Sequence, residues 1–202
     1  MPRTDPPAEV GSRPASSARE RILDTSYGLF SRHGIRAVGV DTVVAESGVA
    51  KMTLYRHFPS KSDLVLAFLE RRDERWTVGW VEAETARRAA APADRLLAIF
   101  DIFDDWFHRD DFEGCSFINV LLEFSDRADV VHQAAVRHLA TICGFLRGLA
   151  EEAGVRDADV FARQWHILMK GSIVAAAEGD VGAARHAKEV GRLLLDHELR
   201  TR

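Results

Sequence analysis

Residues 40–61, VDTVVAESGVAKMTLYRHFPSK, decide the fold of this chain. Valines recur at helical spacing up to Gly48, where a left-handed backbone suits a residue without a Cβ atom. A second helix follows, and its Leu54 and Phe58 are four positions apart, so both face inward. The stretch therefore predicts two short helices joined at Gly48, which is the layout of a DNA-binding helix-turn-helix.

The outer face of the second helix carries hydrogen-bond donors and a cation, which suits a DNA groove lined with phosphates. The predicted DNA-binding residues are Lys51, Met52, Thr53, Tyr55, Arg56, His57 and Lys61. Within this set we expect Tyr55, His57 and Lys61 to hold phosphates and the other four to face base edges. Lys61 begins a further helix, whose free N–H groups also attract phosphate. The alternative for Lys61 is an ordinary surface lysine.

A longer pattern surrounds this stretch, from an Arg-x-x-Ile-Leu helix start, through Leu-Phe and Gly, to Leu-Tyr-x-His-Phe followed by Lys and Leu. Its members are Arg19, Ile22, Leu23, Leu29, Phe30, Gly34, Ala45, Gly48, Val49, Leu54, Tyr55, His57, Phe58, Lys61 and Leu64. On these positions the chain resembles the TetR/AcrR family of transcriptional regulators over roughly residues 19–68. The resemblance implies an all-α protein with an N-terminal three-helix DNA-binding domain joined to a helical ligand-binding and dimerisation domain.

The chain departs from the family pattern at the starts of both helices of the motif. Val38 and Gly39 replace the usual hydroxyl residues before the first helix, and Ala50 stands where Ser is frequent before the second. Glycine is a tolerable N-cap, so the helix is expected to survive without a side-chain cap. Base preference cannot be transferred from relatives across these differences.

Charge and composition divide the 202-residue chain into parts. The net charge is -4, yet residues 1–61 hold nine Lys and Arg against six Asp and Glu. The excess of cations thus lies with the helix-turn-helix, where release of counterions from DNA supplies affinity. We expect a disordered arm over residues 1–17, a DNA-binding domain over 18–64 and an effector-binding and dimerisation domain over 65–202.

The N-terminal arm contains four of the six prolines and too few apolar residues to fold. Arg3 and Arg13 are candidates for contacts with the DNA backbone, and the alternative is a solvated tail. Elsewhere the periodicity is helical. It predicts a helix over about 17–33, a long connecting helix over about 60–88, a helix from about 92, and three long helices over about 128–152, 157–178 and 182–199.

Other features exclude several classes of protein. The two cysteines rule out a disulfide framework and cannot form a metal knuckle, and no signal peptide or membrane-spanning run appears. We therefore expect a cytoplasmic protein that does not enter a membrane. No nucleophile elbow, phosphate-binding glycine loop, dinucleotide fingerprint or His-Glu-x-x-His pair occurs, so we expect no enzyme activity, no cofactor and no metal.

Aromatic residues gather in the second part of the chain, where thirteen of the seventeen lie beyond residue 61. Such residues usually form a core. The family resemblance also implies a chamber for a small-molecule effector, which an aromatic lining suits. The predicted effector-binding residues are Trp80, Phe103, Phe107, Phe117, Asn119, Phe124, Trp165 and Met169. Asn119 either orients the ligand or satisfies the backbone, and Cys115 is either redox-active or a small buried side chain.

The last two helices show more apolar surface than one chain needs. The predicted dimerisation residues are Phe161, Leu168, Ser172, Ala176, Val190 and Leu194. Pairing with a second copy would form a four-helix bundle and place two recognition helices in successive major grooves, about 34–36 Å apart.

The expected function is a ligand-responsive regulator, acting as a repressor at a pseudo-palindromic double-stranded DNA operator. It would bind as a homodimer and be released by a small, largely apolar or aromatic effector. The alternative is an apolar small-molecule binding protein of the same architecture without specific DNA binding. Such a protein would leave the polar surface of residues 51–57 unexplained.

Overall fold

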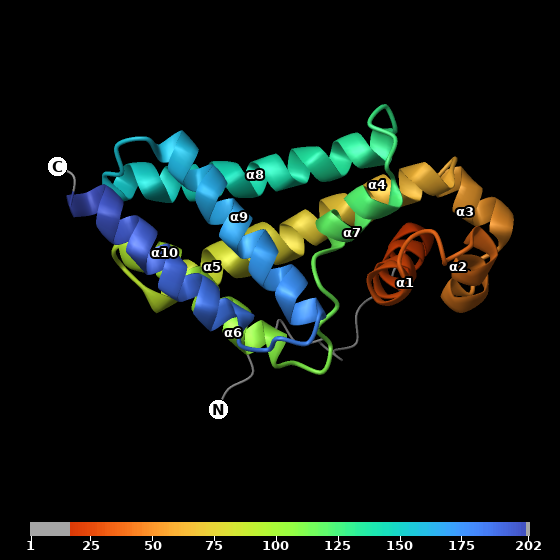
Figure 1. Cartoon of the computed structure of the whole chain (residues 1–202). Helices are drawn as coiled ribbons and strands as arrows, with labels where there is room; N and C mark the ends of the chain where they lie inside the picture. The colour runs from red at the N-terminus through yellow and green to blue at the C-terminus, as the bar shows by residue number, and fades with distance from the viewer. Residues whose placement is uncertain (1–16, 201–202) are drawn as a thin grey trace. The chain divides into compact units, whose positions relative to one another are not determined.

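A computed structural model describes residues 17–200, and every secondary-structure element in that range is helical (Figure 1). The all-α prediction is therefore confirmed for the described part of the chain. The chain divides into two compact units, which meet in sequence between Arg72 and Asp73. Residues 1–16 of the expected arm fall outside the described residues, and so do Arg3 and Arg13.

The first unit contains four helices: α1 (Ala18–His33), α2 (Val40–Ser47), α3 (Lys51–His57) and α4 (Lys61–Arg72). Helix α1 packs against each of the other three. Phe68 of α4 meets both Tyr27 and Phe30 of α1 edge to face, with ring centroids 5.5 Å apart in each pair. The boundary expected after residue 64 thus falls inside α4, because the apolar face of this helix completes the core of the first unit.

Side-chain hydrogen bonds cap the starts of α1 and α4 in this unit. The Ser17 hydroxyl accepts from the backbone N–H of Glu20 at 3.2 Å, which caps α1. At the start of α4, Asp63 accepts from the Ser60 backbone N–H at 2.9 Å, and Ser60 Oγ accepts from the Asp63 N–H at 3.2 Å. This reciprocal pair is a capping box.

The second unit begins with the π-helix η1 (Asp73–Glu82), followed by α5 (Ala83–Arg88) and α6 (Pro92–Phe107). The connecting helix expected to reach about residue 88 is therefore helical throughout, but its middle third is a π-helix. Four further helices complete the unit: α7 (Ser116–Glu123), α8 (Val130–Ala153), α9 (Ala158–Ala177) and α10 (Ala183–Arg200). The three long helices expected after residue 126 correspond to α8, α9 and α10.

The core of the second unit forms where α6, α8, α9 and α10 pack together, with α9 in contact with both α8 and α10 (Figure 1). The residues of α6 that supply it include Leu96, Ile99, Phe100 and Phe103, none of which is measurably exposed. Gly191 lets α10 approach this core closely. A Cβ atom at Gly191 would lie 2.9 Å from the Trp165 ring and 3.1 Å from the Phe100 ring.

Candidate nucleic-acid interface and effector site

The turn between α2 and α3 has the geometry that the sequence predicts. Gly48 adopts the left-handed conformation, with φ 65° and ψ 27°, and ends α2. Neither Gly39 nor Ala50 offers a side-chain cap to the helix that follows it. Burial therefore holds α3 in place, since Leu54 is fully buried and Phe58 is 2% exposed.

The opposite face of α3 is open to solvent. Met52 is 80% exposed, Tyr55 is 38% exposed, and Arg56 is also exposed. These three side chains and the half-buried Thr53 line one shallow surface depression. The structure thus brings together four of the seven predicted DNA-binding residues on a helix whose inner face is fixed.

Lys51 begins α3 and forms an ion pair across the motif. Its Nζ atom lies 2.6 Å from Oδ1 of Asp41, in the first turn of α2. The hydrogen bond to Asp41 and the attraction of its charge raise the pKa of Lys51 above the usual lysine value. Lys51 is therefore cationic, and the sequence reasoning missed Asp41 as its partner.

Lys61 donates a hydrogen bond from Nζ to the backbone carbonyl of Ile35, 2.6 Å away and 26 positions earlier in the chain. This ammonium group therefore helps to hold the loop before α2 against the start of α4. His57, the last residue of α3, is half-buried. The sequence could not predict the Lys61 contact, because the acceptor is the backbone carbonyl of Ile35 and not its side chain.

Part of the predicted effector set lies in one aromatic cluster of the second unit. Trp76 contacts Trp80, Phe103 and Trp106, with ring centroids 5.5–5.9 Å apart. Phe107 joins through Phe103 at 5.7 Å. The cluster therefore unites three predicted residues, and it adds Trp76 and Trp106, which the predicted set omitted although both are aromatic.

The remaining predicted effector residues lie elsewhere in the second unit. Phe117 stacks on His138 of α8 at 5.1 Å. Trp165 stacks on Phe161 within α9 at 5.2 Å, and Met169 is buried on the same helix. Phe124 ends α7, and its carbonyl lies 2.6 Å from Nδ1 of His132.

Asn119 requires a correction, because its side chain is exposed rather than inward. On the short helix α7 the buried face belongs to Phe117 and Val120, which leaves Asn119 facing solvent. Cys115, immediately before α7, is 6% exposed. It matches the expectation of a small buried side chain.

The predicted dimerisation stripe on α9 also requires a correction. Phe161, Ser172 and Ala176 are 1%, 4% and 8% exposed, so they belong to the interior of the single chain. Of the other three, Leu168 and Leu194 are half-buried and Val190 is 50% exposed. Three of the six predicted residues are therefore unavailable to a second copy, and α9 carries apolar residues on two sides.

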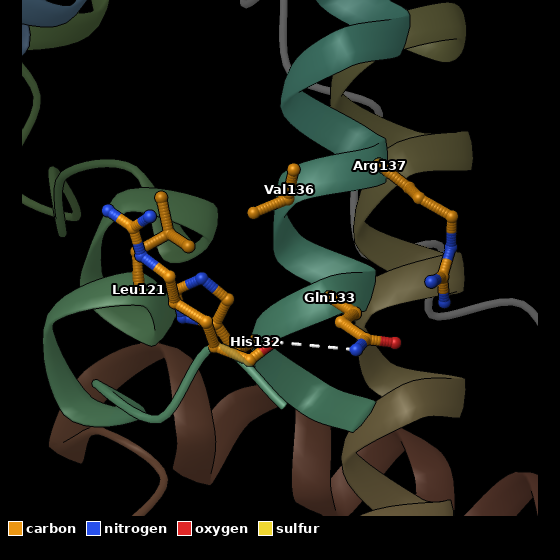
Figure 2. A pocket seen from close by; sticks show the side chains of 6 residues that line it. Leu121, His132, Gln133, Val136 and Arg137 are labelled. Atoms are coloured by element: carbon orange, nitrogen blue, oxygen red, sulfur yellow. Dashed lines mark hydrogen bonds between the residues drawn. The ribbon is translucent and has the colours of Figure 1, made fainter. Parts of the chain in front are cut away.

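The outward apolar stripe of α9 consists of Val160, Ile167 and Val174, spaced seven positions apart and 45–63% exposed. Ile167 and Val174 also line an open apolar groove that continues over Leu121 and Leu122 of α7. A second open groove lies between α7 and the start of α8. Figure 2 shows Leu121, Val136 and Arg137 around it, with Gln133 donating to the Arg127 carbonyl.

Within residues 17–200 no group of three or more His, Cys, Asp or Glu residues is placed to hold a metal ion. Among the helices described, none has the length and apolar character needed to cross a membrane.

Comparison with known proteins adds family matches over most of the chain. Residues 22–68 match the model of bacterial regulatory proteins of the tetR family, and residues 92–190 match that of the tetracyclin repressor-like C-terminal domain. The transcriptional repressor ComR of Escherichia coli K12 is 30% identical over 177 residues, covering 83% of each chain.

Two further similarities support the same placement. The transcriptional repressor KstR of Mycolicibacterium smegmatis is 39% identical over 92 residues, so the match spans 44% of this chain and 43% of that protein. A crystal structure of a regulator from Streptomyces coelicolor superposes with a TM-score of 0.79 at 28% identity, covering 90% of this chain and 95% of that one.

Proposed function

Because the chain belongs to the TetR family of bacterial regulatory proteins, we propose that it is a ligand-responsive repressor of transcription. The observation that carries this proposal is the exposed face of α3 around Met52 and Arg56, held by the fully buried Leu54. Because Met52 is 80% exposed, this face contributes little to the core of the first unit. A major groove of DNA offers the acceptors and phosphates that it matches.

In this proposal the seven predicted DNA-binding residues divide by task. Arg56, Thr53, Met52 and Lys51 meet base edges, while Tyr55, His57 and Lys61 contact phosphates. Two of them have an internal partner that DNA would replace or share. Lys51 would leave Asp41, and Lys61 would share its remaining donors or leave the Ile35 carbonyl. The Asp41 side chain is 81% exposed, so water solvates its carboxylate after Lys51 leaves.

The proposed regulator acts as a homodimer. The exposed apolar residues of α9, together with Val190 and Leu193 of α10 at 50% and 70% exposure, offer surface that a second copy would cover. A two-fold dimer presents two copies of α3 to one face of DNA, about 34–36 Å apart. The operator is then a pseudo-palindrome.

Release from DNA would follow from binding of a small molecule in the second unit, beside the cluster of Trp76, Trp80 and Phe103. A ligand shifts an equilibrium only if it binds one conformation better than the other. Helix α4 ends at Arg72 and η1 begins at Asp73, so the two helices are contiguous in sequence. A change in the helical register of η1 would therefore act directly on α4. Ligand and operator then weaken each other's binding reciprocally.

The test is selection of DNA from a random duplex library with the purified protein, at near-physiological salt. We expect enrichment of a two-fold-symmetric motif, and repression of a reporter placed behind it. Enrichment with activation of the reporter would overturn the repressor assignment alone. No enrichment by protein freed of small molecules by refolding would contradict DNA recognition and favour an apolar ligand-binding protein of the same architecture.

A further inference from the structure

The π-helix η1 is the feature of the second unit that the function described so far leaves unused. Its hydrogen bonds join residues five apart, which widens the turn compared with an α-helix, and such turns are frequent at functional sites. Gly79 makes the wide turn possible. A Cβ atom there would lie only 2.7 Å from the carbonyl oxygen of Glu74, five positions earlier.

Three polar residues recur along η1 at the spacing of this wide turn. Asp73, Thr77 and Glu82 are four and five positions apart, so they lie along one side of the π-helix. Thr77 is 1% exposed, and its hydroxyl has no hydrogen-bond partner among the described residues. One carboxylate oxygen of Asp73, Oδ1, is likewise buried without a partner.

Groups from η1 and the neighbouring helices surround this line. Oδ2 of Asp73 lies 3.3 Å from Nδ1 of His138 on α8. The Nε atom of Arg95 on α6 and the indole nitrogen of Trp76 are also buried and lack partners within the described range. Buried polar groups without partners are rare in proteins and call for an explanation. Here four such groups come from one short segment and the helix beside it.

The electrostatics of this cluster favour a positive group. Burial raises the pKa of Glu82, the charge of Asp73 raises it further, and Arg95 opposes both effects. Asp73 thus has the His138 imidazole as a neighbour, and Glu82 has the charge of Arg95. Beside them the aromatic cluster presents Trp76 and Trp80, and indole rings attract cations over their faces.

We propose that Asp73 and Thr77 form the polar end of the effector site, and that the effector is an amine with an apolar or aromatic body. The protonated amine donates to Asp73 Oδ1 and to the Thr77 hydroxyl. The body of the ligand lies against Trp76 and Trp80. This inference rests on the proposed function, because it names the chemical class of the effector that a repressor of this kind would bind.

The test is calorimetric titration of the full-length protein with three probes that share one ring: naphthylmethylammonium, naphthylmethanol and naphthylacetate. We expect the ammonium compound to bind most tightly, by about tenfold over the alcohol, with the carboxylate weakest. Equal affinities, a preference for the carboxylate or no binding of any probe at millimolar concentration would overturn the proposal.

Three variants sharpen the result. Asp73→Asn and Thr77→Val are nearly isosteric, and each should reduce the preference for the ammonium probe, with Asp73→Asn bringing its affinity to that of the alcohol. Glu74→Gln removes an exposed carboxylate from the same segment and should leave the preference unchanged. Loss of the preference in Glu74→Gln as well would show a general effect of charge and refute the site.

Gly79→Ala addresses the π-helix itself, because alanine fits an α-helix but clashes with the Glu74 carbonyl in the present geometry. We expect this variant to bind the ammonium probe more weakly while its helical circular dichroism is retained. Unchanged affinity would refute a role for the wide turn. Duplex selection with the same protein separates the two proposals. Operator binding without an amine preference removes only this inference, whereas an amine preference without operator binding removes only the proposed function.

Discussion

The two units of this protein differ in how completely their own polar groups are satisfied. In the first unit Arg71 pairs with both Glu20 and Asp24, and Lys61 is engaged by a carbonyl. Ser31 is the one described residue there whose buried polar side-chain atom lacks a partner. The second unit has five such residues, and four of them belong to η1 and α6. The first unit thus leaves fewer of its buried polar groups unpaired than the second, where the unpaired groups lie beside the effector site that we propose.

The largest expected effect tests whether the first unit depends on its core. Leu54→Ala should lower the free energy of unfolding by about 2–5 kcal/mol, because it leaves a cavity under α3. Denaturant titration measures this loss. The exposed Met52→Ala serves as the control and should alter stability little while weakening DNA binding. Equal destabilisation by both variants would contradict the assignment of inner and outer faces.

The next effect concerns pH and the second unit. Burial, reinforced by the charge of Lys170, lowers the pKa of His166 to about 4 from its usual 6.5. The folded state therefore resists protonation of His166. The contribution of neutral His166 to the free energy of unfolding is fully present above pH 6.5 and is lost as the pH falls toward 4. The loss reaches about 3 kcal/mol at most. His166→Gln should flatten the pH dependence of unfolding over that window, and an unchanged profile would show that His166 does not cause it.

Close packing in the second unit gives a prediction of similar or smaller size. Gly191→Ala should lower the free energy of unfolding by about 1–3 kcal/mol, since its methyl group would meet the Trp165 and Phe100 rings. Gly148→Ala is the matched control, because a Cβ atom there meets nothing within 4 Å. It should be neutral or slightly stabilising. Equal destabilisation of the control would mean that replacing any helical glycine lowers the free energy of unfolding, and that the close approach at Gly191 is not the cause.

The smallest expected effect concerns the competition for Lys51. Asp41→Asn removes the carboxylate that pairs with Lys51 and so leaves that cation free for DNA. Affinity for duplex DNA should rise a few-fold at low salt, and the gain should disappear at high salt. Unchanged affinity would place Lys51 outside the DNA interface. Stability should barely change, as is usual for exposed ion pairs.

Much of the first unit could be predicted because its signals are local. Gly48 ends a helix, and Leu54 and Phe58 take the buried face, as their spacing requires. The contact of Lys61 could not be predicted, since its acceptor is a backbone atom far away in sequence.

In the second unit two features depend on tertiary packing. Both sides of α9 are apolar, so periodicity alone could not distinguish the buried Phe161 from the exposed Ile167. The π-helix was also missed, because residues that form it are compatible with an α-helix. Only the geometry at Gly79 shows why the wider turn is accommodated.

The most direct test of the central claim is the affinity of three proteins for a selected operator and a scrambled duplex at fixed salt: the wild type, Arg56→Ala and Arg156→Ala. Arg156 is an exposed arginine of the α8–α9 connection and serves as the matched control. The account predicts that Arg56→Ala loses about 1–3 kcal/mol of binding to the operator and most of its preference over the scrambled duplex. Arg156→Ala should bind like the wild type. Equal behaviour of the two variants would contradict the claim that the exposed face of α3 recognises DNA.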